Sequence, residues 1–116
     1  CGGLSLGFDA AGFAVSAAVE FDPLATLSHA RNFFAGDARH ARSHDITTTS
    51  PAELAEACGL GKNLAGCIDV IVGGPPCQAF ARVGRAKLRE VDAHPTAFKQ
   101  DARGNLYLRH LHYVEA

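Results

Sequence analysis

A cysteine in a glycine- and proline-rich frame is the residue of this chain best suited to covalent chemistry. Cys77 ends the run GGPPC at residues 73–77, which follows a short apolar stretch at residues 68–72. Active sites of open α/β sheets lie just beyond the carboxyl ends of strands. The prolines fix the backbone before Cys77, and the glycines allow other groups to approach closely. The frame predicts a nucleophile, whereas an isolated cysteine is more often a buried apolar residue.

Positive charge follows Cys77 along the chain. Four cations lie between residues 82 and 89, namely Arg82, Arg85, Lys87 and Arg89. A basic loop beside a nucleophile can hold the phosphates of a nucleic acid, although an isolated charge run is more often solvated surface. The position next to Cys77 favours phosphate binding.

Three further segments are suited to a nucleoside cofactor. A glycine-rich loop at residues 1–7 enters a helix, where backbone N–H groups can bind a carboxylate or phosphate. Glu20 ends a predicted strand and can accept from ribose hydroxyls. Asp45 can accept from an adenine amino group, with Ile46 beside the ring. Each also has a purely structural interpretation: tight packing, a solvated strand end and a turn residue. The chain has no P-loop sequence and no intact G-x-G-x-x-G pattern.

The elements that must position these residues alternate between helix and strand. Apolar runs predict buried strands at residues 14–19 and 68–72, separated by loops at 36–49 and before the second strand. Residues 79–102 are a predicted loop. Capping residues and helix breakers predict four helices. The first ends at Gly12, and the second is capped by Asp22 and runs from Pro23 to about Phe34. The third begins with a capping box at Ser50 and Glu53 and ends at Gly59, and the fourth starts near Arg103 or Asn105. The alternation predicts a parallel sheet with helices on its faces.

Composition places the chain among folded proteins. Its 116 residues are 47% hydrophobic, enough for one small domain or part of a larger one. The net charge is −1, so any contact with nucleic acid must be local. No apolar run is long enough for a membrane span. The four cysteines form no C-x-x-C pair and the six histidines are scattered, which predicts no metal site and a reducing, cytoplasmic setting.

Both ends suggest a piece of a longer domain. The chain begins at Cys1 and contains no methionine, no strand precedes its glycine-rich loop, and its last helix has no cap. We therefore expect sequence on both sides of residues 1–116.

The motifs, in this order, resemble those of the DNA (cytosine-5) methyltransferases. GGPPCQAF at residues 73–80 is similar to the catalytic Pro-Cys-Gln motif, and GGLSLGF at residues 2–8 to the end of the first cofactor motif. Residues 18–22 are similar to the second motif, residues 45–46 to the third, and residues 101–106 to the segment after the catalytic loop. The resemblance implies an α/β, S-adenosylmethionine-dependent methyltransferase core with a mostly parallel sheet and helices on both faces, here incomplete.

The resemblance also implies a reaction and the residues that carry it out. Double-stranded DNA would present a flipped-out cytosine, Cys77 would attack its C6 as a thiolate, and C5 would take the methyl group of S-adenosylmethionine. We expect a monomer without a metal. The implied cofactor residues are Gly2, Gly3, Leu4, Glu20, Phe21, Asp45, Ile46, Pro76 and Leu106, and the implied DNA-binding residues are Gln78, Arg82 and Arg85.

The chain also departs from the family pattern. It lacks the opening Phe-x-Gly, the Glu-Asn-Val motif, the later arginine-containing motif, the target-recognition domain and the closing motif, and Ala81 stands where Ser or Thr is common. We therefore expect residues 1–116 to be a partial catalytic domain that is inactive alone. Three alternatives stay open: a tRNA cytosine-5 methyltransferase of the same family, a non-catalytic nucleic-acid-binding homologue, and an unrelated thiol-redox domain, which the lack of a cysteine close to Cys77 disfavours.

Overall fold

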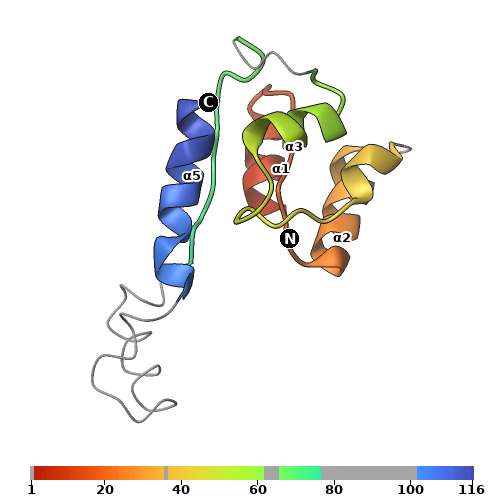
Figure 1. Ribbon diagram of the computed structural model, residues 1–116. Helices are drawn as coiled ribbons and strands as arrows, with labels where there is room; N and C mark the ends of the chain where they lie inside the picture. Colours follow the sequence, from red (N-terminus) through yellow and green to blue (C-terminus); the bar gives the residue numbers. More distant parts are fainter. Residues whose placement is uncertain (1, 36, 62–65, 77–101) are drawn as a thin grey trace. The chain divides into compact units, whose positions relative to one another are not determined.

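The computed structural model describes residues 2–35, 37–61, 66–76 and 102–116 (Figure 1). The four predicted helices are confirmed, and within the described residues two short 3-10 helices accompany them. In chain order the elements are α1 (Gly3–Ala10), α2 (Pro23–Phe33), η1 (Ala38–Ala41), α3 (Pro51–Ala57), η3 (Ala102–Asn105) and α5 (Leu106–Glu115). None of these helices, which cover the described helical residues, is long and apolar enough to cross a bilayer.

Helix α1 ends at a left-handed glycine, as its sequence predicts. Gly12 has φ 91°, a conformation that costs glycine nothing because it has no Cβ. The Gly12 amide donates to the Asp9 carbonyl at 2.9 Å and the Phe13 amide to the Phe8 carbonyl at 3.0 Å. The rings of Phe8 and Phe13 meet edge to face at 5.3 Å. These contacts satisfy carbonyls that the helix end would otherwise leave without partners.

Helix α3 is defined at both ends by the predicted local chemistry. The Glu53 amide donates to Ser50 Oγ at 3.3 Å, and the Ser50 amide donates to the Glu53 carboxylate at 2.8 Å. This is the reciprocal capping box. At the other end Gly59 has φ 81°, and its amide donates to Glu56 at 3.0 Å. The helix is short, and its buried side chains are Leu54 and Ala55.

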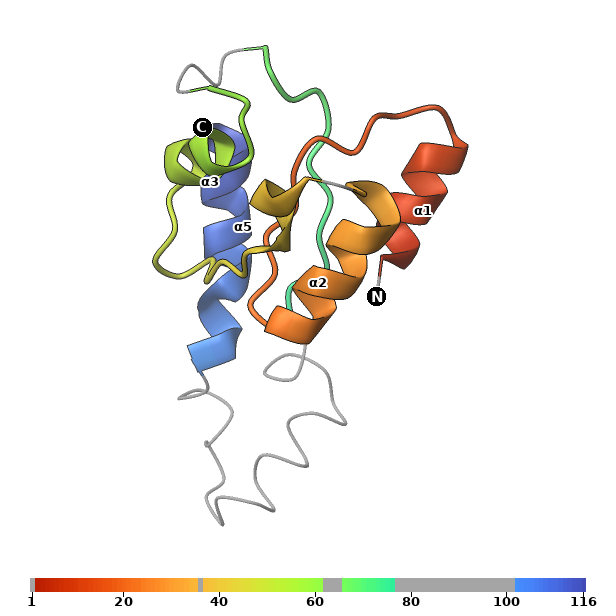
Figure 2. The ribbon, with the colours of Figure 1, turned by 90° about the vertical axis from the view of Figure 1, so that its right-hand side faces the viewer.

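The prediction that residues 36–49 form only irregular loop is wrong at one point. Residues Ala38–Ala41 form η1, which Asp37 caps by accepting from the Arg39 amide at 3.0 Å. Helices α2 and η1 are in contact and lie side by side in both views (Figure 2). An aspartate that caps a single short turn is a weak sequence signal, because the same residue is equally common in open turns.

The predicted strands at residues 14–19 and 68–72 are absent from the described structure. Both segments lack helix and also lack the hydrogen-bond ladder of a strand. Val70 and Val72 remain 45% and 46% exposed. A strand exists only through hydrogen bonds to a neighbouring strand, so an apolar β-branched run indicates a preference without creating a sheet. The parallel sheet therefore stays a prediction.

The chain divides into two compact units, Cys1–Val72 with Ala116, and Gly73–Glu115. The first unit contains α1, α2, η1 and α3, and the buried ones among its described residues are Thr26, Ala30, Leu54, Ala55 and Cys58. The second unit contains η3 and α5. Within it the backbone of Gly73 lies against the His110 ring, since an added Cβ would lie 2.9 Å from His110 Nδ1.

We predict that Ser50→Ala lowers the free energy of unfolding by about 1 kcal/mol, because it removes the N-cap acceptor of α3. Ser50→Asp retains an acceptor at this position and should stay near the wild-type stability. Urea denaturation measures both values. Equal stability of Ser50→Ala and wild type would contradict the role assigned to the capping box.

Candidate cofactor site

The carbonyl oxygen of Glu20 joins two of the segments that the sequence assigns to the cofactor. It accepts from the His44 amide at 2.8 Å. Glu20 and Phe21 are thereby brought next to the segment that contains Asp45 and Ile46. Two motifs that are far apart in the sequence therefore lie together in the first unit, as a shared nucleoside site requires.

The side chains of Glu20 and Phe21 are held at the start of α2. Glu20 Oε1 accepts from the Asp22 amide at 3.0 Å, and the residue is exposed. Phe21 is 72% exposed, whereas phenylalanine is most often buried in folded proteins. Together they present a carboxylate beside an open aromatic face.

The turn that leads from these residues into α2 is tightly fixed. Asp22 Oδ1 accepts from the amides of Leu24 and Ala25, each at 2.8 Å, and Pro23 occupies the first helical turn. The hydroxyl of the buried Thr26 donates to the Asp22 carbonyl at 2.9 Å and lies 3.3 Å from the Glu20 carbonyl. The first turn of α2 therefore sets the position of the Glu20 backbone.

Asp45 shapes its own loop. Its Oδ1 accepts from the amide of Thr47 at 2.8 Å and from the hydroxyl of Thr47 at 2.7 Å. Its carbonyl accepts from the Thr49 amide at 2.8 Å. The turn interpretation of Asp45 is thus confirmed, and it coexists with the position beside Glu20 that the cofactor interpretation needs.

The glycine-rich loop presents an open helix N-terminus. Gly2 has φ 91° and precedes α1, and its carbonyl accepts from the Leu6 amide at 2.8 Å. Among the described residues no side chain caps this helix. A Cβ built on Gly3 would meet nothing within 4 Å. The first-turn amides of α1 therefore have no side-chain cap at Gly2, and helix N-terminal amides of this kind can bind a carboxylate.

One of the scattered histidines, His29, lies against this loop. His29 Nε2 is 2.7 Å from Ser5 Oγ. The His29 ring stacks at a tilt on Phe33, with centroids 4.7 Å apart. Burial lowers the pKa of His29, and the negative charge of Glu20 opposes this shift. The sequence carried one signal for the contact, namely the helical apolar spacing that includes residues 29–30 and 33–34.

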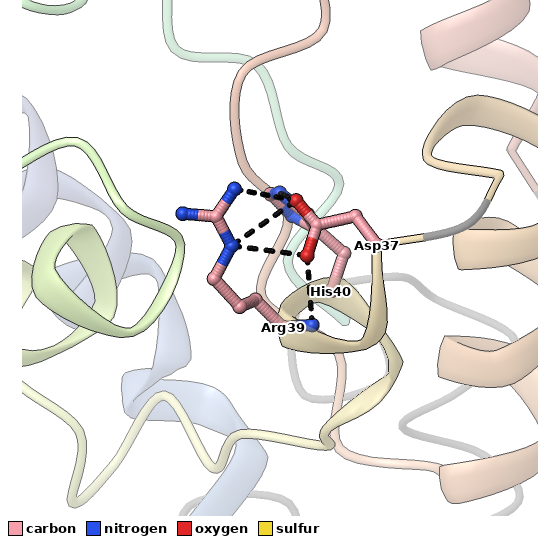
Figure 3. A network of polar contacts seen from close by, with 3 residues as sticks. All are labelled: Asp37, Arg39 and His40. Carbon is pink, nitrogen blue, oxygen red and sulfur yellow. Dashed lines mark hydrogen bonds and ion pairs between the residues drawn. The ribbon is translucent and has the colours of Figure 1, made fainter.

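A polar cluster consisting of Asp37, Arg39 and His40 holds η1 in place (Figure 3). The Arg39 guanidinium pairs with Asp37 Oδ2 at 2.6 Å, and hydrogen bonds from Arg39 lower the pKa of Asp37 to about 2. The His40 ring stacks on Phe34 with centroids 3.6 Å apart and planes 4° apart. Arg39 also lies so close to Gly59 that a side chain there would collide with it. The cluster connects the end of α2 to the end of α3.

The remaining predicted site residues fall in the second unit or outside the described residues. Pro76 and Leu106 are both half-buried in the second unit. Cys77, Gln78, Arg82 and Arg85 lie outside the described residues. Across the parts of the chain that the structure describes, no group of three His, Cys, Asp or Glu side chains could hold a metal ion.

Comparisons with known proteins agree with the motifs. The model of the C-5 cytosine-specific DNA methylase family matches residues 1–115. A protein of Oceanobacillus iheyensis whose name describes it as the type II methyltransferase M.OihORF3336P is 36% identical over 116 residues, which cover 98% of this chain and 24% of that protein. Type II methyltransferase M.XorII of Xanthomonas oryzae pv. oryzae is 40% identical over 87 residues, 75% of this chain and 19% of that protein. M.NgoPII of Neisseria gonorrhoeae is 32% identical over 120 residues, all of this chain and 27% of that protein.

The chain thus spans about a quarter of the length of these relatives. No solved structure matches it.

We predict that the imidazoles of His29 and His40 titrate below pH 6.5, because burial is the largest influence on the pKa of each ring and lowers it. Their folded pKa values lie below the unfolded ones. The stability they contribute is therefore complete above pH 6.5 and is lost as the pH falls through the folded pKa values. Histidine ring proton shifts, assigned with His29→Phe and His40→Phe, measure both midpoints. Midpoints at or above pH 6.5 would contradict the burial described.

Proposed function

Because the chain belongs to the C-5 cytosine-specific DNA methylase family, we propose that the protein containing it methylates C5 of cytosine in double-stranded DNA. The methyl donor is S-adenosylmethionine, and the chain supplies the larger part of its binding site. The observation that carries this proposal is the match of the family model over residues 1–115. The hydrogen bond from the His44 amide to the Glu20 carbonyl, which joins two segments proposed to bind the cofactor, supports it. The relatives are named type II methyltransferases, which supports a role as the modifying enzyme of a restriction–modification pair.

The first unit offers groups that fit each part of the cofactor. The open amides of Gly3 and Leu4 suit its carboxylate, while the exposed carboxylate of Glu20 suits the two ribose hydroxyls. The exposed ring of Phe21 provides an apolar face for adenine. Asp45 and Ile46 would border the same ring. When bound, the cofactor supplies an electrophilic methyl group on a sulfonium sulfur.

Cys77 is proposed as the nucleophile. Its thiolate adds to C6 of a cytosine that has been rotated out of the duplex, and C5 thereby becomes nucleophilic enough to take the methyl group. Loss of the C5 proton to a base and cleavage of the sulfur–C6 bond then restore the aromatic ring and the thiolate. An ordinary thiol is mostly protonated at neutral pH, so the cations Arg82 and Arg85 would help to ionise it.

The remaining residues are proposed to complete the pocket and hold DNA. Pro76 and Leu106 would line the cofactor pocket, and Gln78, Arg82 and Arg85 would contact DNA in the loop after the cysteine. We propose that the apolar segments at residues 14–19 and 68–72 are strands of a parallel sheet in the complete catalytic domain. Residues 1–116 would then be an inactive part of a monomeric enzyme that works in a reducing cytoplasm and needs no metal.

We predict a covalent adduct between Cys77 and DNA. The full-length protein is incubated with S-adenosylmethionine and a duplex containing 5-fluorocytosine, whose fluorine cannot leave as a proton does, so the reaction stops at the methylated adduct. Intact and peptide mass spectrometry should locate the added mass on Cys77, and Cys77→Ser should show none while still binding the cofactor. An adduct formed with 5-fluorocytosine tRNA and not with DNA, or none with either, would overturn the DNA assignment.

We predict that Glu20→Ala raises the dissociation constant of S-adenosylmethionine about 5- to 150-fold, equivalent to about 1–3 kcal/mol for lost hydrogen bonds to a charged group. The substitution leaves the Glu20 carbonyl in place, so the hydrogen bond from His44 is retained. Isothermal titration calorimetry of the full-length protein gives the value. Asp9→Ala, which removes an exposed carboxylate from the same unit, is the control and should bind normally. An unchanged constant for Glu20→Ala would remove Glu20 from the site.

A further inference from the structure

We propose that His29 is a positioning residue for the cofactor, acting through Ser5 and Gly2 to hold the glycine-rich loop at its working distance from Glu20. This inference rests on the proposed function. It concerns a residue of α2 that lies outside the family motifs described above and that contacts the loop from behind.

The first contact is a hydrogen bond between helices. Ser5 lies in the first turn of α1, and its Oγ is 2.7 Å from His29 Nε2 across 24 residues of sequence. A serine near a helix N-terminus commonly bonds to the backbone of its own turn. Here the hydroxyl is directed to α2 instead, and it donates to the ring nitrogen when that nitrogen carries no proton. The bond therefore ties the open end of α1 to α2, which lies beside it (Figure 2).

The second contact is steric and involves Gly2. A Cβ on Gly2 would lie 2.7 Å from Phe33 Cε2 and 3.5 Å from His29 Cδ2. The Gly2 backbone thus rests directly on the His29–Phe33 ring pair, whose centroids are 4.7 Å apart. Any shift of the His29 ring would change where this peptide sits, and with it the direction of the first-turn amides.

The charge state of His29 is compatible with this role. Burial disfavours the imidazolium and lowers its pKa, so the ring is neutral near pH 7 and Nε2 can accept from Ser5. Among the described residues, α1 has neither a side-chain cap nor an acidic residue in its first turn. The orientation of its open end therefore depends on contacts from α2.

Helix α2 consequently links the two ends of the proposed site. Its first turn fixes Glu20 through Asp22 and Thr26, and its later turns hold the loop through His29 and Phe33. His29 lies seven positions after Asp22, which corresponds to a rise of about 10 Å along α2. A rigid spacer of this kind would set the distance between the groups that bind the ribose and those that bind the carboxylate.

Calorimetry on the full-length protein tests the role of His29. His29→Phe keeps a ring against Phe33 and removes the nitrogen, and Ser5→Ala removes the same bond from the other helix. Each should raise the S-adenosylmethionine dissociation constant about fivefold, the effect of one neutral hydrogen bond. The double variant should bind no more weakly than either single one. His29→Gln, which can place an amide near the Nε2 position, should recover most of the affinity.

Kinetics and a control separate positioning from general destabilisation. The KM for S-adenosylmethionine should rise in His29→Phe, while kcat at saturating cofactor and the KM for DNA stay near wild type. Asp9→Ala changes an exposed side chain of α1 beyond its first turn and leaves Ser5 and His29 in place, so it should leave cofactor affinity unchanged. If the wild-type protein binds the cofactor and both His29→Phe and Ser5→Ala bind it with the same affinity, this inference is overturned and the proposed function is not. A wild type that binds no S-adenosylmethionine would overturn the proposed function with it.

Discussion

One main-chain oxygen, the carbonyl oxygen of Glu20, connects three segments of the first unit. The Glu20 carbonyl accepts from the His44 amide and lies within reach of the Thr26 hydroxyl, so it connects the end of the 13–20 segment, the first turn of α2 and the loop that leads to Asp45. A main-chain hydrogen bond between two segments fixes their spacing regardless of side-chain identity. The exposed side chains of Glu20 and Phe21 can therefore point outward to a ligand, because the backbone holds the two segments together.

The need to fix the spacing of these segments also accounts for the contacts at both ends of α2. Asp22 caps its start, and the stack of Phe34 on His40 joins its end to η1. The ion pair of Asp37 with Arg39 then holds η1 beside Gly59, at the end of α3. The Asp37–Arg39 ion pair is open to solvent, and such a pair contributes little to stability by itself. The value of these contacts is geometric, because each one limits how the helix carrying Thr26 and His29 can move relative to the loops it supports.

The parts of the fold that sequence predicts well are those decided within a few residues. The Asp22 cap, the Ser50–Glu53 capping box and the left-handed glycines Gly12 and Gly59 depend on neighbouring atoms only, and all four occur as predicted. The strands are different, because their hydrogen bonds belong to partners elsewhere in a sheet.

In the candidate site, too, the residue types could be predicted from the sequence, whereas the contacts between distant segments could not. The residue types of Glu20 and Asp45 indicate side chains that can bind a cofactor. Their proximity, however, depends on a main-chain hydrogen bond, which no particular residue type in the sequence indicates. The role of His29 cannot be read from its own segment, because its partner Ser5 lies on another helix. The roles of Cys77 and the basic residues after it rest on motif and family, which specify chemistry without specifying geometry.

The most direct test is a crystal structure of the full-length protein with S-adenosylhomocysteine, the demethylated form of the proposed cofactor. The account predicts that the Glu20 carboxylate accepts from the ribose hydroxyls, that the Phe21 ring lies on adenine, and that the amides at the start of α1 meet the carboxylate. The bond from the His44 amide to the Glu20 carbonyl should be intact. A ligand bound away from Glu20 and Phe21, or a structure in which that bond is absent, would contradict the account.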